Sequence, residues 1–378
     1  MSDASSRLLI EPKAWLDVDP DPRSRSALDQ LSSNPQLLVS HFGNKLSFGT
    51  AGLRAERGVG PSRMNRVTVR VAARAIGSYL ATRGLTEKGI VIGYDARPDS
   101  DIYALDSARL LTALGVSCWL IDGPVPTPVV VWHQTKLSAA GAIVVTASHN
   151  PSSDSGYKVY GPDGTQIRPP IDQEIESLMT FDSLPLETDL AEAGEVSKLN
   201  PQDAISAYVR AAITQPAPSD IAKPSTKWVY TPLCGVGGET LEAACSFTGI
   251  PRPIRVISQF VPDGSFPGLP FPNPEEVGVL NEALQTADEN NVDLVLANDP
   301  DADRLAVAIK TNDSWNQLSG DELGLLLCDY QLSTTAGRDR LTASSVVSSE
   351  AIAALCALHG VDHVRTLTGF KWIMEPAV

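Results

Sequence analysis

Three aspartates alternate with other residues in the segment NDPDADR, which lies between two apolar stretches. They are Asp299, Asp301 and Asp303. Carboxylates at this spacing on one loop can converge on a single hard cation, and Mg²⁺ suits a site that keeps positions open for a phosphate oxygen. A calcium-binding EF-hand begins in the same way but then requires Gly and Glu where this chain has Arg304 and Lys310. The segment therefore predicts a divalent-metal site, and the alternative is a solvated acidic turn.

A second polar segment follows the apolar run AIVV and places a serine, a histidine and an asparagine in succession. Ser148 is a candidate reactive hydroxyl, because α/β sheets bind ligands beyond the carboxyl ends of their strands. The alternative is a helix cap, with Asn150 as the N-cap and Pro151 at the first helical position. His149 adjoins Ser148, and neighbouring side chains on an extended chain point apart. Since the flanking glycines of a hydrolase elbow are also missing, a serine-hydrolase triad is not supported.

The elements that must position these residues alternate between strands and helices. Strands are predicted at 89–97, 116–122 and up to Ser148, and helices at 66–84, 99–115 and 126–141. The pattern restarts at 227–249 with strand, Gly-rich turn and helix, continues as a strand, acidic turn and strand at 291–310, and restarts again after 314–330. A linker is predicted at about 180–200. Alternation at this spacing predicts an α/β fold with mostly parallel sheets.

Glycines crowd the segment GVGG at residues 235–238, between a predicted strand and a predicted helix. Close packing of the strand on the helix is the favoured interpretation, and anion binding is the alternative. The chain contains neither G-x-x-x-x-G-K-[ST] nor G-x-G-x-x-G, so neither a P-loop nor a dinucleotide fingerprint is present.

Composition narrows the classes of protein that the chain could represent. A length of 378 residues suggests two or three domains, and a net charge of −15 argues against a nucleic-acid partner. The first 30 residues hold no apolar stretch long enough for a signal peptide, and no membrane span is expected. Five dispersed cysteines without a C-x-x-C pair are interpreted as structural residues of a reducing compartment, which predicts a cytoplasmic protein.

When the serine segment and the acidic turn are considered together, the chain resembles the α-D-phosphohexomutase superfamily. Its closest branch is that of bacterial phosphoglucomutases and phosphomannomutases related to phosphopentomutases. The segments that carry the resemblance occur in the family's order. They are FGTAGLR (48–54), GYDAR (93–97), PTPVV (126–130), TASHNP (146–151), GYKVY (156–160), YTPLCGVGG (230–238), FPNPEE (271–276), NDPDADR (298–304), SGDELG (319–324) and TLTGFKW (366–372).

This resemblance implies roles for particular residues. Ser148 would carry a phosphoryl group that passes to a sugar phosphate, giving a bisphosphate whose other phosphoryl returns to the serine. The three aspartates would hold Mg²⁺ together with an oxygen of that phosphate. Further catalytic and substrate-binding positions implied by the family are Arg54, His149, Lys158, Arg304, Thr368, Gly369 and Lys371. Taken singly, each basic residue among these could also be an ordinary surface charge.

The resemblance also implies a division of the chain. The expected parts are a helical extension (1–40), a first domain with the phosphoserine loop (41–200), a second domain with the metal loop (201–312) and a truncated third, sugar-binding domain (313–378). Successive mixed-sheet α/β domains are expected, two complete and one truncated, with the family's fourth domain absent. Smaller departures from the family pattern are Ala55 and Cys234.

The expected function is that of a phosphosugar mutase that uses Mg²⁺ and a hexose bisphosphate activator. Its substrate would be a glucose, mannose or pentose phosphate, and the sequence does not choose among them or predict an oligomeric state. The family's Glu-Glu sugar loop and its Arg-x-Ser-Gly-Thr-type phosphate loop are not found. The alternative is therefore a fragment with little or no activity, which binds Mg²⁺ but cannot hold substrate.

Overall fold

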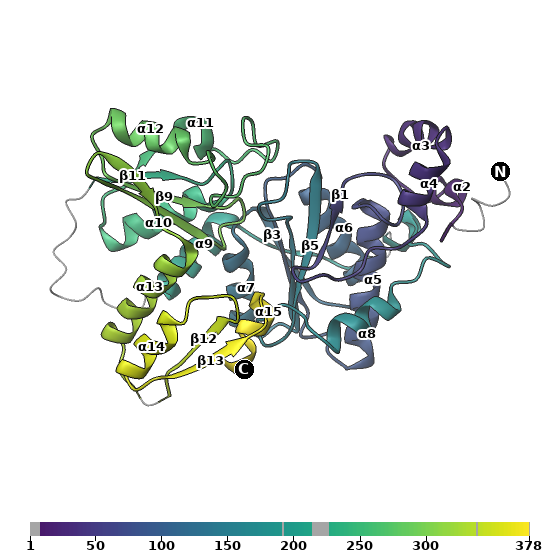
Figure 1. Cartoon of the computed structure of the whole chain (residues 1–378). Helices are drawn as coiled ribbons and strands as arrows, with labels where there is room; N and C mark the ends of the chain where they lie inside the picture. The colour runs from purple at the N-terminus through teal and green to yellow at the C-terminus, as the bar shows by residue number, and fades with distance from the viewer. Residues whose placement is uncertain (1–7, 191–192, 214–226, 338, 378) are drawn as a thin grey trace. The chain divides into compact units, whose positions relative to one another are not determined.

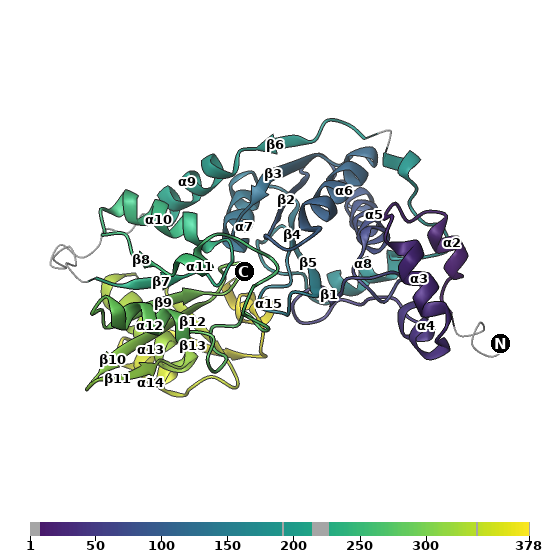
Figure 2. The same ribbon diagram turned by 90° about the horizontal axis from the view of Figure 1, so that it is seen from above.

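The structure is a computed structural model that describes residues 8–190, 193–213, 227–337 and 339–377. The chain divides into two compact units, unit 1 (Met1–Ala204) and unit 2 (Ile205–Val378), which are described separately. Figures 1 and 2 together label the helices and strands of both units. Within the described ranges, no helix combines the length and the apolar character needed to cross a membrane.

Unit 1 contains a six-stranded mixed sheet in the order β1-β5-β4-β2-β3-β6. Its strands are β1 (Leu53–Glu56), β2 (Ile90–Tyr94), β3 (Cys118–Pro124), β4 (Gly141–Val145), β5 (Asp154–Tyr160) and β6 (Ser197–Leu199). The pairs β4–β2, β2–β3 and β3–β6 are parallel, whereas β5 runs antiparallel to both β4 and β1. The predicted α/β class is thus confirmed, with a mixed sheet.

Helices cover both faces of this sheet. The helices of unit 1 are α2 (Pro12–Leu16), α3 (Ser24–Ser32), α4 (Pro35–Phe42), α5 (Arg66–Thr82), α6 (Ser100–Ala113), α7 (Thr127–Lys136), α8 (Ile171–Leu178) and the short 3-10 helix η1 (Glu187–Leu190). Figure 2 shows α5 and α6 on one side of the strands and α7 on the other. The N-cap of α5 is Asn65, whose side chain accepts a hydrogen bond from the amide of Thr68, and most of the helix is buried.

One alternative and one prediction for unit 1 are wrong. No helix follows Ser148: the chain turns at Asn150 and enters β5 at Asp154, so Asn150 is not a helix cap. The stretch 180–200 is also not simply a linker, because its last residues form β6 at the edge of the sheet beside β3. A three-residue strand carries too little apolar pattern to be seen in the sequence, and its pairing with β3 defines it.

Unit 2 contains a five-stranded sheet in the order β11-β10-β9-β7-β8 and a two-stranded parallel sheet, β12–β13. The strands are β7 (Val229–Thr231), β8 (Ile254–Arg255), β9 (Leu294–Asn298), β10 (Leu305–Thr311), β11 (Ser314–Gln317), β12 (Leu341–Ser345) and β13 (Asp362–Thr366). The hairpin β9–β10 is antiparallel, with Leu305 opposite Asn298. This register places the acidic turn at the tip of the hairpin.

The helices of this unit follow the predicted alternation. They are α9 (Pro201–Ala212, which begins in unit 1), α10 (Gly237–Thr248), α11 (Ile257–Phe260), α12 (Asn281–Glu289), α13 (Gly320–Thr334), α14 (Ala351–Leu358), α15 (Phe370–Ile373) and the 3-10 helix η2 (Glu375–Ala377). In Figures 1 and 2, α10 and α12 lie on opposite faces of the five-stranded sheet. The helix α13 begins with a capping box formed by Ser319 and Glu322.

Candidate functional site

Ser148 occupies a tight, buried loop directly after β4. Its backbone has φ 51°, in the left-handed region, and the residue is 1% exposed. The amide of Ser148 donates to Oγ1 of Thr146 at 2.9 Å. Its Oγ lies 3.1 Å from Nδ1 of His149, within hydrogen-bond distance. The expectation that these neighbouring side chains point apart is therefore wrong, because it assumed an extended backbone at Ser148.

A buried arginine holds this loop in place. The side chain of Arg97 is 0% exposed. Its Nη2 donates to the carbonyl oxygens of Ser148 at 2.6 Å and Asn150 at 2.7 Å. Its Nη1 donates to the carbonyl oxygens of Pro151 at 2.7 Å and Asp154 at 3.1 Å. One guanidinium thus binds four carbonyls of a single loop, a geometry that an arginine fork can satisfy and a lysine cannot.

Asp95 balances the charge of Arg97. Its carboxylate lies 3.2 Å from Nε of Arg97, and it accepts hydrogen bonds from the amide of Arg97 and the hydroxyl of Ser100. Burial raises the pKa of Asp95, while Arg97 and these hydrogen bonds oppose the increase. Sequence reasoning assigned no role to this pair. The available signal was two charged residues in the turn immediately after an apolar strand.

Two further predicted residues lie on one face of the same sheet. Arg54 on β1 is directly opposite Gly156 on β5, and Lys158 lies two residues further along β5, so both side chains leave the sheet on the same face. Arg54 donates from Nη1 to Oδ1 of Asn150 at 2.9 Å, which ties β1 to the serine loop. Lys158 is 2% exposed.

Glycine is required at one position in FGTAGLR. Gly52 has φ 90°, and an added Cβ would lie 2.4 Å from the carbonyl oxygen of Tyr157. A side chain there would push β1, and with it Arg54, away from β5.

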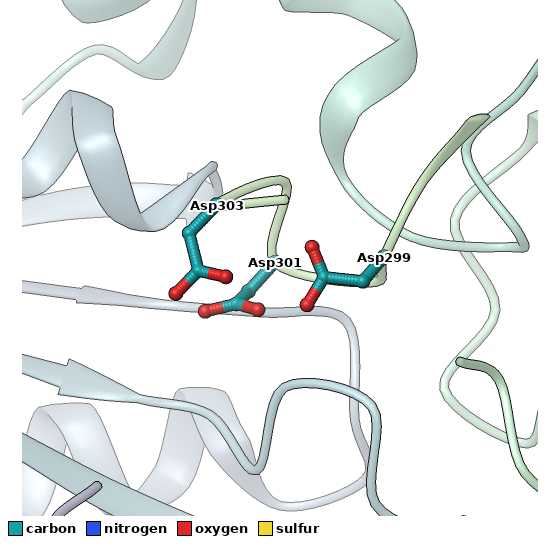
Figure 3. A group of neighbouring side chains, drawn as sticks. All are labelled: Asp299, Asp301 and Asp303. Carbon is teal, nitrogen blue, oxygen red and sulfur yellow. The ribbon is translucent and has the colours of Figure 1, made fainter. Parts of the chain in front are cut away.

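The acidic turn in unit 2 brings its three carboxylates together. Figure 3 shows them on the same side of the turn, and one oxygen from each lies within 4.8 Å of the others. The turn closes through a hydrogen bond from the Ala302 amide to the carbonyl of Asp299 at 2.9 Å, with Ala302 at φ 53°. The amide of Arg304 also donates to Oδ1 of Asp299 at 3.1 Å. Backbone geometry therefore determines where the carboxylates converge.

The donor set fits a hard divalent cation. Asp299 and Asp301 are each 0% exposed, and Asp303 is partly buried. A solvated turn would expose these groups, and three carboxylates this close repel one another in the absence of a cation. The arrangement disfavours the alternative of a solvated acidic turn and is suited to Mg²⁺.

The glycine-rich segment supports this turn. The amide of Val236 donates to the carbonyl of Pro300 at 2.8 Å. A Cβ on Gly235 would lie 2.3 Å from Cα of Pro300, so only glycine allows the two segments to come this close. A Cβ on Gly237, at the start of α10, would lie 2.7 Å from the hydroxyl oxygen of Tyr230 on β7. The predicted close packing is confirmed, and its partners include the acidic turn itself.

The remaining predicted residues lie around the turn and at the end of β13. Arg304 is 41% exposed, and its Nε is 3.9 Å from a carboxylate oxygen of Asp303. Thr368 is exposed, and Gly369, at φ 121°, precedes α15. Lys371 is 8% exposed, with Nζ 5.6 Å above the ring of Trp372.

The predicted residues therefore form three local groups. Ser148, His149, Arg54 and Lys158 belong to the β1-β5-β4 part of unit 1, and Asp299, Asp301, Asp303 and Arg304 to the β9–β10 turn of unit 2. Thr368, Gly369 and Lys371 make up the segment between β13 and α15.

Comparison with known proteins identifies the domains of the chain. The phosphoglucomutase/phosphomannomutase alpha/beta/alpha domains I, II and III match residues 45–184, 206–312 and 319–377. The chain belongs to this family. The resemblance inferred from the sequence motifs is confirmed, as is the succession of α/β domains.

Several relatives are named as mutases of different sugar phosphates. A probable phosphomannomutase of Haemophilus influenzae is 38% identical over 317 residues, which are 82% of this chain and 64% of that protein. Mouse phosphopentomutase is 35% identical, covering 97% of this chain and 63% of that protein. A probable phosphoribomutase of Schizosaccharomyces pombe is also 35% identical, with 96% and 65% covered. The chain thus spans slightly less than two thirds of the length of these relatives.

A solved structure shares the fold. The putative phosphomannomutase of Thermus thermophilus superposes with a TM-score of 0.73 at 24% identity, covering 88% of this chain and 71% of that one.

Proposed function

We propose that this protein is a phosphosugar mutase that moves a phosphoryl group within a hexose or pentose phosphate through phosphorylated Ser148 and a sugar bisphosphate. One observation carries the proposal: a serine hydroxyl is held in a strained, buried loop by a guanidinium that binds four of the loop's carbonyls. Such rigid placement suits phosphoryl transfer, which depends mainly on positioning and charge neutralisation.

Each nearby side chain has a proposed part in this chemistry. When the sugar hydroxyl attacks phosphorus, the hydroxyl releases its proton to solvent and the bond to Oγ of Ser148 breaks. A proton on Nδ1 of His149 can be donated to the departing oxygen across 3.1 Å. Arg54 and Lys158 supply positive charge on the same face of the sheet and would bind phosphate oxygens.

The predicted residues of unit 2 also have proposed roles. Asp299, Asp301 and Asp303 would hold Mg²⁺, which neutralises charge on a phosphate oxygen when bound. By the resemblance described above, an oxygen of the Ser148 phosphate would be a further ligand, and Arg304, Thr368, Gly369 and Lys371 would bind the substrate.

The substrate class is proposed from the relatives, which are named for mannose, pentose and ribose phosphates. A hexose bisphosphate would serve as the activator that first phosphorylates the serine. A cytoplasmic location is proposed with it, since sugar phosphates are metabolites of that compartment.

Phosphopeptide mapping tests the assignment. The chain is incubated with Mg²⁺ and glucose 1,6-bisphosphate labelled in its phosphates, then digested and sequenced by mass spectrometry. The label is expected on Ser148, and Ser148→Ala should abolish it. The matched control is Ser153→Ala, because Ser153 is an exposed serine of the same loop. Label on another residue, or undiminished label in Ser148→Ala, would overturn the proposed mechanism.

A further inference from the structure

Two cysteines in unit 2 lie side by side although 28 residues separate them. Cys328 belongs to α13 and Cys356 to α14, and their sulfur atoms are 3.9 Å apart. Cys356 is 0% exposed, whereas Cys328 is only partly buried. Both are free thiols in this structure. The sequence presented them as isolated structural residues, because no short motif joins them.

Cys356 also begins a chain of hydrogen bonds that can remove its proton. Its sulfur lies 3.0 Å from Oγ1 of Thr342, and that hydroxyl lies 2.8 Å from Nδ1 of His363. The carbonyl of Asp362 is a second, longer acceptor for the hydroxyl at 3.3 Å. Nε2 of His363 is 3.1 Å from Oγ of Ser344, so a proton on Nε2 leaves Nδ1 as the acceptor. A proton can therefore pass from the thiol of Cys356 to the hydroxyl of Thr342 and from there to the imidazole of His363.

An open cavity makes the other thiol accessible. Its volume is about 630 Å³, and Cys328 and Thr342 line it together with Leu327, Gln331 and Arg340. A small oxidant can therefore reach Cys328, while Cys356 lies behind it in the small core that includes Leu332 and Val361. The accessible sulfur of Cys328 is suited to react with the oxidant first. The buried sulfur of Cys356, which has a proton acceptor, is suited to be the resolving thiol that then forms the disulfide.

We propose that Cys328 and Cys356 are an oxidisable dithiol that forms a disulfide between α13 and α14 when the protein meets a peroxide. The Cys328 thiolate attacks one peroxide oxygen, the O–O bond breaks, and water leaves after protonation, giving a sulfenic acid. The Cys356 sulfur, having passed its proton through Thr342 to His363, then attacks the Cys328 sulfur. The S–O bond breaks and a second water leaves. Two thiols lose two electrons in total, and the peroxide gains them.

The first step is slow, because burial and the adjacent Cys356 raise the pKa of Cys328 to about 11. The reaction is therefore followed over hours rather than seconds. It does not depend on the proposed mutase function, since neither thiol belongs to the groups assigned to phosphoryl transfer.

The test uses the full chain treated with hydrogen peroxide and then denatured and alkylated. Two of the five thiols should resist alkylation, and digestion without reductant should yield one linked pair of peptides, containing Cys328 and Cys356. A dithiol reductant should restore both. The link should disappear in Cys328→Ser, which alters only a partly exposed side chain, and persist in the matched control Cys245→Ser, which changes a buried cysteine on α10.

A second pair of variants tests the relay. Thr342→Val keeps the shape of the side chain but removes the hydroxyl, and should slow the closing of the disulfide several-fold while sulfenic acid accumulates on Cys328. Thr342→Ser should close at the wild-type rate. The proposal is overturned if wild-type Cys328 proceeds to sulfinic acid while Cys356 stays alkylatable, or if any other pair of cysteines is linked instead.

Discussion

The guanidinium of Arg97 donates a 2.6 Å hydrogen bond to the carbonyl oxygen of Ser148, a residue 51 positions later in the chain. Because this oxygen is part of the peptide that follows the serine, the bond acts on the backbone angles at Ser148 and not on its hydroxyl. Arg97 is thus a positioning residue, held in turn by the buried carboxylate of Asp95. Changes to it should separate loop geometry from the chemistry of the hydroxyl.

Arg97→Lys should slow phosphoryl transfer to Ser148 and lower stability together. An ammonium group has only three donors and cannot bind four carbonyls, and buried hydrogen bonds to a charged group contribute roughly 1.5–3 kcal/mol each. Arg97→Ala should cost more, since it removes all four hydrogen bonds and also leaves Asp95 buried without its partner, a loss that alone amounts to about 3–5 kcal/mol. Urea unfolding measures stability, and the labelling experiment measures transfer.

The matched control is Arg57→Lys. Arg57 also binds this loop, at the carbonyls of Ser152 and Asp154, but it is partly exposed and makes no bond to the peptide of Ser148. Its variant should label Ser148 nearly as fast as the wild type. Equal labelling rates in Arg97→Lys and Arg57→Lys would show that Arg97 does not position Ser148.

Mg²⁺ should stabilise unit 2 through the acidic turn. At a hundredfold excess over Kd, binding to the folded state alone contributes about 2.7 kcal/mol. Asp301→Asn should remove most of this gain, and without metal it should be at least as stable as the wild type because repulsion among the carboxylates is reduced. Thermal unfolding with and without Mg²⁺, supported by titration calorimetry, measures both effects.

Asp313→Asn provides the comparison for this experiment. Asp313 is an exposed aspartate in the turn between β10 and β11 of the same sheet, where φ is 60° and asparagine is readily accommodated. It should keep the full response to Mg²⁺. If both variants respond as the wild type does, the three aspartates are not the metal site.

Gly235→Ala should damage the metal site from a distance. The new methyl group would meet the backbone of Pro300, at 2.3 Å from Cα and 2.4 Å from the carbonyl oxygen, so the acidic turn must shift. We expect a loss of roughly 1–3 kcal/mol and a weaker response to Mg²⁺. Gly320→Ala, whose nearest atom is a flexible carboxylate oxygen of Glu275 at 3.6 Å, should change stability by less than about 1 kcal/mol. An unchanged Mg²⁺ response in Gly235→Ala would refute the packing argument.

Stability should fall as pH decreases from 7 toward 5. Burial lowers the pKa of His133 below its ordinary value of 6.5, with Lys136 adding to this effect and the hydrogen bond to the Ala204 carbonyl opposing it. The unfolded chain therefore binds more protons than the folded one. The stability that His133 contributes is complete above pH 6.5 and is lost as pH falls below that value toward the folded-state pKa.

His133→Gln should flatten this dependence, because an amide can donate to the same carbonyl without titrating. Burial lowers the pKa of His41 as well, so part of the slope should remain. The measurement is urea unfolding at half-unit steps of pH, and a wild-type slope in His133→Gln would contradict the assignment.

The sequence by itself determined the features that depend on neighbouring residues. Apolar periodicity and turn residues predicted the alternating strands and helices, including α5, α6 and the β9–β10 hairpin. Three aspartates spaced two apart predicted the cluster in Figure 3, because a short turn leaves their carboxylates few ways to diverge. The family motifs could be recognised for the same reason, since each is a short continuous segment.

Only the tertiary structure decided what distant segments do to one another. The left-handed backbone of Ser148 places its hydroxyl beside His149, and Arg97 reaches the loop from the end of another strand. The pairing of β6 with β3 and the meeting of Cys328 with Cys356 are of the same kind. Such contacts leave no periodicity in the sequence, because they depend on how whole strands and helices pack, and packing is determined by the sum of many weak interactions spread along the chain.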